Sequence, residues 1–569
     1  MASSKQHNPR FDPTLFERAL SHIAPKTAQR LHVNRVKFEA SSMVSRGLGG
    51  YLGARRDRTA TAGWNPGGGS PAVDILPDLS TLRDRSRDQM RNAPVALGAL
   101  QTDALHSVGT GLTYNPAIDH KRLGITQERA DEWSEDVKWR FGNWAKSTDC
   151  DYYRKLDFYG QQYLDYSSWR ESGDAFVLTP LMVRSSRQIL VLQVIEADRV
   201  CNPKGQPLTT KMQDGVELTE EGIAVAVHIA KNHPGDTTTG NEWTRVPIRG
   251  EKTDRLNVLH LIDILRPAQN RGVPWIAPIL EPLKQLQKWS DSELNAAVVS
   301  SVFAVFMEMD AEAFGDLFDD ESASKIVKKA EKWSGELESG KVVNLLPGEK
   351  ANMQTPGRPN PEFDPFFQSL MTQMGMALGI PKEVLLMHYQ SSYTAARGAL
   401  LMAWRYFYLR RDKMVKLFCQ PVFELWLTNE VTEGRISCPG FFADPDIRAA
   451  WCNAIWTGDG PGSVDPVKDV TAAEKRVAMG ISTLQAESIL HDGQDWEAKH
   501  RQRTKEVAMQ KRDGTAPAAL PGAAPVEPPD NNGTDDDREV PTAQPKPRNA
   551  PPPPRPAPAP VQRPRRDKV

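Results

Sequence analysis

The chain has 569 residues, more than one hydrophobic core usually serves, so two to four lobes are expected. Its 71 Lys and Arg residues balance 72 Asp and Glu residues, which leaves a formal net charge of −1. This balance argues against a protein that grips nucleic acid over its whole surface, although a local patch can still contact DNA. Five cysteines without a CxxC pair argue against a disulfide framework or a thiolate zinc site and favour a reducing compartment.

The N-terminal residues lack the charged-then-apolar pattern of a signal peptide, and the most apolar stretch, Ala296–Met307, is about half the length that a bilayer requires. The sequence therefore predicts a soluble protein without a membrane partner.

Residues 1–75 predict a partly flexible N-terminal arm, because the glycine-rich text from Arg46 to Ala72 carries a high backbone entropy cost. Within this arm, Phe11–Ala24 has the pattern of a helix. Order is expected to return near Asp78, where Ser80 is the predicted cap of a helix and Pro94 either breaks that helix or starts a second one.

A change of pattern between Tyr159 and Leu265 predicts an α+β lobe. A helical opening is followed by apolar runs separated by Gly, Asp and Asn turns, which is typical of strands. The predicted strands are AFVLTPLMV (175–183), QILVLQVIEA (188–197), GIAVAVHIA (222–230), EWTRVPI (242–248) and NVLHLIDIL (257–265).

A helical region follows. A helix of roughly 30 residues is expected over Trp275–Met309, with Pro274 directly before it and Pro278 and Pro282 confined to its start. Residues 310–340 read as acidic and helical, and KVVNLLPGEKANMQTP (341–356) as a strand, a Pro-Gly turn and a second strand. Pro361 opens another helix, which Gly379 should end.

From Tyr393 a long basic helix is predicted, because apolar residues recur at helical spacing and proline is absent until Pro421. Its arginines and lysines have two interpretations. They form either the solvated face of a helix that packs in the core, or a face that has a function of its own. Two short helices and a charged third follow within 465–512. Residues 513–569 contain 16 prolines and few large apolar groups, so we expect a disordered tail.

No catalytic constellation is found. The chain has no GxxxxGK[ST], HExxH, GxSxG or EF-hand pattern, the Gly109–Gly111 segment lacks a third glycine, and the histidines share no ligand spacing. We therefore expect no catalytic residue, no metal site and no cofactor, and a structural protein is favoured over an enzyme.

Four segments, in the same order as in the family, resemble the lambda-family phage portal proteins across about residues 45–512. They are LRDRSRDQMRNAPVALGALQTDALHSVGTGL (82–112), RGVPWIAPILEPLKQLQKWSDSELNAA (271–297), LLPGE (345–349) and YTAARGALLMAWRYF (393–407). The third reads LLPGE where the family has a double proline. The arm and the tail carry no resemblance.

The resemblance implies a predominantly helical α+β portal fold that assembles into a dodecameric ring at one capsid vertex, a conduit for double-stranded DNA. It also implies binding to terminase, the major capsid protein and head-completion proteins, and residence in the virion after assembly in the host cytoplasm. The implied parts are the wing (76–270), first stem helix (271–309), clip (310–357), second stem helix (358–380), channel loop (381–392), spine helix and wing (393–464) and crown (465–512).

Two sets of site residues follow from the resemblance. The channel loop should present His388, Tyr389, Gln390, Ser391 and Ser392 to DNA, with Lys382 near its base; alternatively, His388 and Tyr389 pack between neighbouring subunits. The clip should present Lys341, Glu349 and Lys350 to the terminase motor; alternatively, this strand-turn-strand forms a β contact between subunits.

Two other classes of protein stay open at this stage. A DNA-processing enzyme subunit would use the basic helix for binding and would need a carboxylate cluster for metal-dependent cleavage. A monomeric minor head protein would share the setting but not form a ring.

Overall fold

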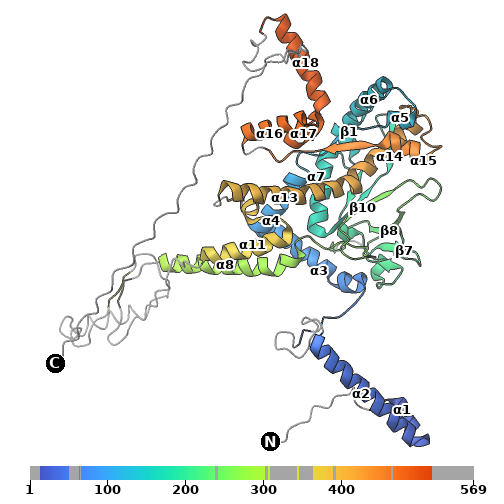
Figure 1. The fold of residues 1–569 in the computed structure, drawn as a ribbon, viewed down its shortest axis with the longest axis vertical. Coiled ribbons are helices and arrows are strands. Elements are labelled where there is room, and N and C mark those ends of the chain that lie inside the picture. Colours follow the sequence, from blue (N-terminus) through green and yellow to red (C-terminus); the bar gives the residue numbers. More distant parts are fainter. Residues whose placement is uncertain are drawn as a thin grey trace, which may run out of the picture. The chain divides into compact units, whose positions relative to one another are not determined.

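The computed structural model describes residues 13–49, 63–64, 66–236, 241–301, 305–307, 342–344, 363–388, 392–462 and 465–515. The chain divides into two compact units, residues 1–500 and 501–569. The described part is a mainly helical α+β protein, as the sequence predicts (Figure 1). No helix within these ranges is both long and apolar enough to cross a membrane.

The N-terminal region forms two helices, α1 (Leu15–Ile23) and α2 (Pro25–Gly49). A capping box begins α1, and Glu17 accepts hydrogen bonds from Arg35 of α2, with 3.0 Å between its Oε1 and the arginine Nε. The sequence predicts only the first of these helices. The sequence does not predict α2, whose two glycines lie in its last turn.

Helices α3 (Pro71–Asn92) and α4 (Pro94–Ser107) follow. The predicted start at Ser80 is wrong, because Ser70 caps α3 by accepting a hydrogen bond from the Val73 N–H, and Ser80 lies inside the helix. Pro94 does start a second helix, as predicted, because a proline at the first helical position needs no N–H partner.

The α+β lobe is confirmed. Its helices are α5 (His120–Leu123), α6 (Gln127–Lys146) and α7 (Phe158–Ser172). A three-stranded antiparallel sheet has the order β10 (Val258–Ile262), β2 (Asp174–Leu178), β5 (Gln193–Ile195). A hairpin joins β3 (Leu181–Arg184) and β4 (Arg187–Leu190), and a four-stranded sheet contains β6 (Met212–Gln213), β7 (Val216–Leu218), β8 (Ala224–Ala230) and β9 (Trp243–Pro247). The run predicted over 175–183 is divided at Pro180, which cannot donate to a ladder.

Helix α8 (Leu280–Ser301) is shorter than the predicted Trp275–Met309. A 3₁₀ turn at Ala277–Ile279 precedes it, and Val305–Met307 forms strand β11, which pairs in parallel with β12 (Val342–Asn344). The β-branched Val305 suits a strand, and an apolar run this short does not distinguish the two structures by periodicity. The predicted helix over 310–340 and the strand after the Pro-Gly turn lie outside the described residues.

Helix α11 (Phe363–Leu378) begins and ends where the sequence predicts. It lies beside α8 (Figure 1), and the Trp289 and Phe363 rings stack with centroids 4.5 Å apart.

The long basic helix continues past Pro421, the first proline after its start. Helix α13 (Tyr393–Met414) passes through a π-helical turn, Val415–Cys419, into α14 (Gln420–Thr432). The helix passes Pro421 because the wider turn lies immediately before the proline, where the ring would clash with an ordinary α-helical turn.

The C-terminal elements include one strand that the sequence does not predict. Helix α15 (Pro445–Cys452) precedes β13 (Ala454–Thr457), which pairs with the distant β1 (Thr113–Pro116) in antiparallel register. Helices α16 (Pro466–Ala478), α17 (Leu484–Asp492) and α18 (Trp496–Arg512) match the three predicted ones. Of the second unit, residues 501–515 are described, and the predicted disordered tail lies mostly outside them.

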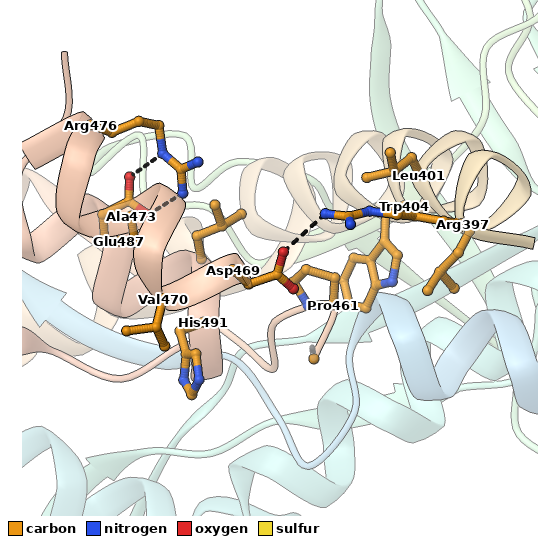
Figure 2. Close-up of a pocket in the computed structure, with 13 residues that line it drawn as sticks. Arg397, Leu401, Trp404, Pro461, Asp469, Val470, Ala473, Arg476, Glu487 and His491 are labelled. Atoms are coloured by element: carbon orange, nitrogen blue, oxygen red, sulfur yellow. Dashed lines mark hydrogen bonds and ion pairs between the residues drawn. The ribbon is translucent and has the colours of Figure 1, made fainter. Parts of the chain in front are cut away.

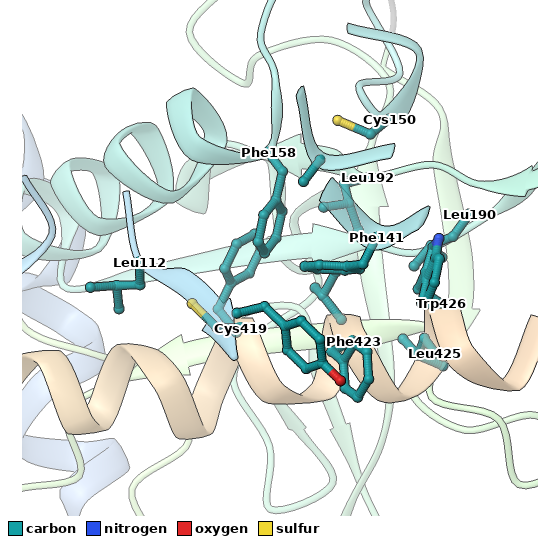
Figure 3. Packing of buried hydrophobic residues seen from close by; sticks show 14 of the residues in the cluster. Leu112, Phe141, Cys150, Phe158, Leu190, Leu192, Cys419, Phe423, Leu425 and Trp426 are labelled. Carbon is teal, nitrogen blue, oxygen red and sulfur yellow. The ribbon is translucent and has the colours of Figure 1, made fainter. Parts of the chain in front are cut away.

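Aromatic rings form the centre of the main hydrophobic core (Figure 3). The Phe141 ring of α6 lies with its centroid 5.7 Å from that of Phe158, 5.4 Å from Phe423 and 5.1 Å from Trp426. These contacts bury the middle of α14 against α6 and α7, so residues nearly 300 positions apart in sequence share one core.

A carboxyl group stands unpaired beside this core. Asp165 of α7 is fully buried, and neither side-chain oxygen has a hydrogen-bond partner within the described ranges. Burial raises the pKa of Asp165 well above its usual value, and the Asp151 carboxylate adds to the rise. The folded protein therefore favours the protonated acid.

We expect Asp165→Asn to flatten the pH dependence of stability. Above the ordinary carboxyl pKa the unfolded state ionises while the folded state keeps its proton, so wild-type stability falls by up to about 1.4 kcal/mol for each pH unit until the raised pKa is reached. The asparagine cannot ionise. Thermal unfolding at pH 5, 6, 7 and 8 should show a smaller decline for the variant, and an equal decline for both proteins would refute the assignment.

Candidate functional site

The turn between α11 and α13 begins at a glycine. Gly379 has φ +68°, and a Cβ at this position would lie 3.0 Å from the Tyr406 ring of α13. A left-handed backbone conformation and a close aromatic neighbour therefore both favour glycine here.

A short helix occupies the first half of the predicted channel loop. Residues Lys382–Leu385 form α12, so the expectation of a loop over 381–392 is wrong for this part. The reason is apolar anchoring, since Val384 and Leu385 are buried among side chains of α4, α11 and α13. The following Met387 and His388 are exposed, and Met387 has φ +51°, an unfavourable conformation for a residue with a side chain. The turn thus has a buried base, Val384 and Leu385, and an exposed tip, Met387 and His388.

The described site residues have different settings. Lys382 is half-buried at the first position of α12. His388 is exposed, and its backbone N–H donates a hydrogen bond of 3.1 Å to the backbone carbonyl of Glu383. Ser392 caps α13, because its Oγ accepts a hydrogen bond of 3.4 Å from the Ala395 N–H. Its hydroxyl therefore has a structural partner.

The remaining predicted site residues lie outside the part of the chain that the structure describes. They are Tyr389, Gln390 and Ser391 of the loop, and Lys341, Glu349 and Lys350 of the segment before α11.

Two consecutive arginines join α13 to the ends of neighbouring helices. Arg410 donates to the Asp103 carboxylate of α4 and to the carbonyl of Leu378, the last residue of α11. Arg411 donates to the carbonyls of Ser107 and His106 at the end of α4, both at 3.0 Å. A guanidinium at a helix C-terminus satisfies carbonyls without an intrahelical partner and opposes the negative end of the helix dipole.

Asp103 is the centre of this arrangement. Its buried carboxylate also accepts hydrogen bonds from the Tyr166 hydroxyl at 2.8 Å and from the Arg170 Nε at 3.1 Å. Arg170 extends the network to Asp263 at 2.9 Å, and Lys413 of α13 binds the same aspartate. The network thus connects α4, α7, α11 and α13 through charges removed from water.

The reading of the arginines as a solvated basic face is wrong for Arg410 and Arg411, which are both buried. The sequence contains the signal that identifies them. They follow the buried Phe407 by three and four residues, which places them on the same side of the helix.

A second arginine contact links α13 to α16. Arg397 pairs with Asp469 at 2.9 Å, and Arg476 pairs with Glu487 of α17 at 2.7 Å (Figure 2). The two ion pairs flank an apolar groove of about 320 Å³ between these helices.

One group of side chains in the described ranges has atoms close enough to hold an ion, namely Glu196, Asp198 and His233. Arg87 already pairs with both carboxylates, at 3.3 Å from Glu196 and in a shorter contact with Asp198. We therefore interpret the group as an ion-pair cluster of the fold.

Comparison with known proteins decides the family. The sequence model of the family described as "Phage portal protein, lambda family" matches residues 57–411. The chain belongs to this family.

Similar proteins cover most of the chain. Portal protein B of Escherichia phage lambda is 25% identical over 481 residues, covering 81% of this chain and 90% of that protein. The portal protein of Escherichia phage N15 is 27% identical over 500 residues, covering 84% and 92%. Among solved structures, a chain from the "Neck of native GTA particle computed with C12 symmetry" has a TM-score of 0.39 at 11% identity, covering 73% of this chain and 92% of that one.

Family membership confirms the portal role inferred from the sequence. The chain is a phage portal protein, a structural component of an oligomeric assembly at the portal vertex of the virion. The family is structural rather than enzymatic, so the DNA-processing enzyme and the monomeric minor head protein are not favoured.

We expect Arg410→Met to destabilise the protein by about 3–5 kcal/mol, because the substitution leaves the buried Asp103 carboxylate with less compensating charge. The matched control is Arg245→Met, which removes a two-bond pair with Glu217 at the surface and should cost at most about 1 kcal/mol. Chemical denaturation followed by tryptophan fluorescence measures both. Equal losses would show that Arg410 contributes no more than a surface pair.

Proposed function

We propose that twelve copies of this portal protein form a ring at one capsid vertex, and that double-stranded DNA enters and leaves the capsid through the channel of the ring. The match to the lambda family across residues 57–411 carries this proposal. The proposal extends to binding of terminase, the major capsid protein and head-completion proteins, and to assembly in the host cytoplasm.

The parts of the ring are assigned as follows in this proposal. Residues 76–270 and 393–464 form the wing with α13 as its spine, the paired helices α8 and α11 form the stem, residues 310–357 the clip, and 465–512 the crown. The parallel pairing of β11 with β12 supports the assignment of the clip, because the pairing holds the two ends of the segment between these strands side by side.

The turn at 381–392 is the proposed contact with DNA. A channel through which DNA moves must not bind it tightly. A protein that neutralises 6–10 phosphates binds DNA strongly, and its affinity falls by about 10³–10⁵-fold with a modest rise in salt concentration. The proposed contact consists of His388, Tyr389, Gln390, Ser391 and Ser392, and the one lysine of the set, Lys382, lies near the base of the turn. Such a tip allows weak contacts that do not depend on base sequence.

We expect replacement of residues 388–391 by Gly-Ser to leave assembled rings intact and to reduce the DNA packaged or retained per particle, because the buried base formed by Val384 and Leu385 remains. Negative-stain microscopy counts the rings, and nuclease-protected DNA measures packaging. The control is the same replacement in the β7–β8 turn, residues 219–222, which should leave packaging unchanged. Normal packaging by the 388–391 variant would contradict the proposed contact, whereas loss of rings would favour packing of the loop between subunits.

The clip residues Lys341, Glu349 and Lys350 are proposed to contact the terminase motor. Charge reversal at all three should weaken terminase binding to preformed rings, measured by surface plasmon resonance. Lys252→Glu, an exposed substitution in the wing, is the control. Unchanged affinity would remove the motor contact, and failure to assemble would favour the alternative of a β contact between subunits.

A further inference from the structure

The tip of the β3–β4 hairpin combines two unfavourable features. Ser185 and Ser186 occupy its two central positions with φ +47° and +62°, positive values that asparagine and glycine adopt more easily in a turn of this kind. Arg184 and Arg187 flank the turn and lie directly opposite each other in the ladder, where like charges repel. A hairpin that only connected two strands would need neither feature, which indicates a role for the two arginines beyond the fold.

A cavity of about 300 Å³ lies beside this tip. Helix α6, the hairpin and the end of α14 contribute to its wall, and we call it the hairpin cavity. The apolar part of the wall includes the rings of Trp139 and Trp144. The charged lining residues are Arg140, Asp149, Arg184, Arg187, Glu430 and Arg435. Arginines outnumber carboxylates in this set, so the lining carries an excess of positive charge.

Two of these arginines have a carboxylate partner within the fold. The Arg140 Nε lies 2.9 Å and 2.8 Å from the two carboxylate oxygens of Asp136. Arg435 donates to both oxygens of Glu430 at 2.7 Å. Since a two-bond pair of this kind satisfies both charges, the excess positive charge belongs to Arg184 and Arg187.

The buried Arg184 has a donor without an acceptor. Its side chain is 5% exposed, and its Nη2 donates to the backbone carbonyl of Tyr152 at 3.0 Å. Its Nη1 has no hydrogen-bond partner within the described residues. The Asp149 carboxylate lies 3.8 Å from this Nη1, beyond hydrogen-bonding distance, and is closer to Arg154, at 3.2 Å. A buried guanidinium with incomplete hydrogen bonds favours the binding of a further acceptor.

Arg187 is a second cation without a carboxylate partner. It is exposed, lines the hairpin cavity and makes no ion pair within the part of the chain that the structure describes. A guanidinium presents several N–H donors in one plane and binds two oxygens of a carboxylate or a phosphate together. Arg184 and Arg187 therefore give the cavity the chemistry of an oxyanion site.

The other lining residues distinguish between oxyanions. Trp139 is 67% exposed, and tryptophan and arginine contribute most of the binding energy in protein interfaces. Asp149 and Glu430 line the same cavity and would repel a chain of phosphates, whereas a DNA-binding surface places several cations along the backbone. A single carboxylate with an apolar neighbour suits both the arginines and the indole ring.

We propose that the hairpin cavity binds an acidic side chain of another protein, with its carboxylate between Arg184 and Arg187 and an apolar neighbour against Trp139. All of the lining residues belong to one copy of the chain, so the site does not depend on the proposed ring. The partner segment is defined by its chemistry, an aspartate or a glutamate beside a large apolar residue.

The first experiment uses two arrays of immobilised pentapeptides that differ only in the central residue, aspartate or asparagine, with the flanking positions varied. Fluorescently labelled full-length protein should bind aspartate peptides that carry leucine, phenylalanine or tryptophan beside the aspartate. It should bind the corresponding asparagine peptides at least about tenfold more weakly, because the charge-assisted hydrogen bonds are lost. Equal binding to the two arrays, or binding to neither, overturns the inference.

The second experiment compares two lining arginines by fluorescence polarisation with the best aspartate peptide. Arg187→Gln should lower the affinity at least about fivefold, because it removes a cation that has no partner in the fold. Arg140→Gln removes the same charge from a residue already paired with Asp136, and should change the affinity less than about twofold. Circular dichroism confirms that both variants are folded. Equal losses would mean that only the overall charge of the cavity matters, which overturns the proposed contact.

A duplex oligonucleotide and inorganic phosphate test the competing oxyanions. The peptide should stay bound in the presence of either at the same ionic strength. Displacement of the peptide by the duplex, together with weaker duplex binding by the Arg187→Gln variant, would assign the cavity to DNA and overturn the inference. Tighter binding of inorganic phosphate than of the best peptide would overturn it as well.

The outcomes separate this inference from the proposed function. Negative-stain microscopy shows whether the wild-type chain forms rings, and the peptide affinity reports on the hairpin cavity alone. Rings without peptide binding would remove the site and leave the proposed function. Peptide binding without rings would leave the site and remove the proposed function.

Discussion

The ion pair between Arg410 and the buried Asp103 carboxylate holds the centre of this fold together. A carboxylate removed from water is stable only when nearby cations and hydrogen-bond donors replace its hydration. Asp103 obtains them from Tyr166, Arg170 and Arg410. Two of these donors lie on α7 and the third on α13, so satisfying one charge on α4 fixes the relative positions of the three helices.

The same arginine connects this centre to the turn that we assign to the channel. Arg410 binds the last carbonyl of α11, and Gly379 follows directly with its left-handed backbone. The start of the turn is therefore attached to the charged centre, while Val384 and Leu385 anchor the turn to the apolar cluster beside it. A displacement of α11 along its axis would break a hydrogen bond to a buried cation, which resists such motion.

Much of the fold is predictable from sequence because it depends on local patterns. Apolar spacing identifies α13, Gly379 marks the end of α11, and the alternating runs identify the sheets. The errors arise where distant residues decide the structure. Strand β13 forms because β1, more than 300 residues away in sequence, supplies its partner.

The candidate site was less predictable, for a similar reason. A run of polar residues indicates an exposed turn but cannot show that Ser392 caps a helix. The roles of Arg410 and Arg411 depend on Asp103 and on carbonyls of α4 and α11, whose proximity is a property of the tertiary fold. Helical spacing from Phe407 was the one local sign of their burial.

The pairing of β11 with β12 has a consequence for how this protein can vary. Because Val305 lies opposite Val342 in a parallel ladder, the two ends of the segment between β11 and β12 lie side by side. The entropy of closing such a segment changes slowly with its length. Insertions or deletions between the two strands can therefore change the length of this segment at a small cost in free energy while α8 and α11 keep their packing, so this segment can vary more freely than the helices that flank it.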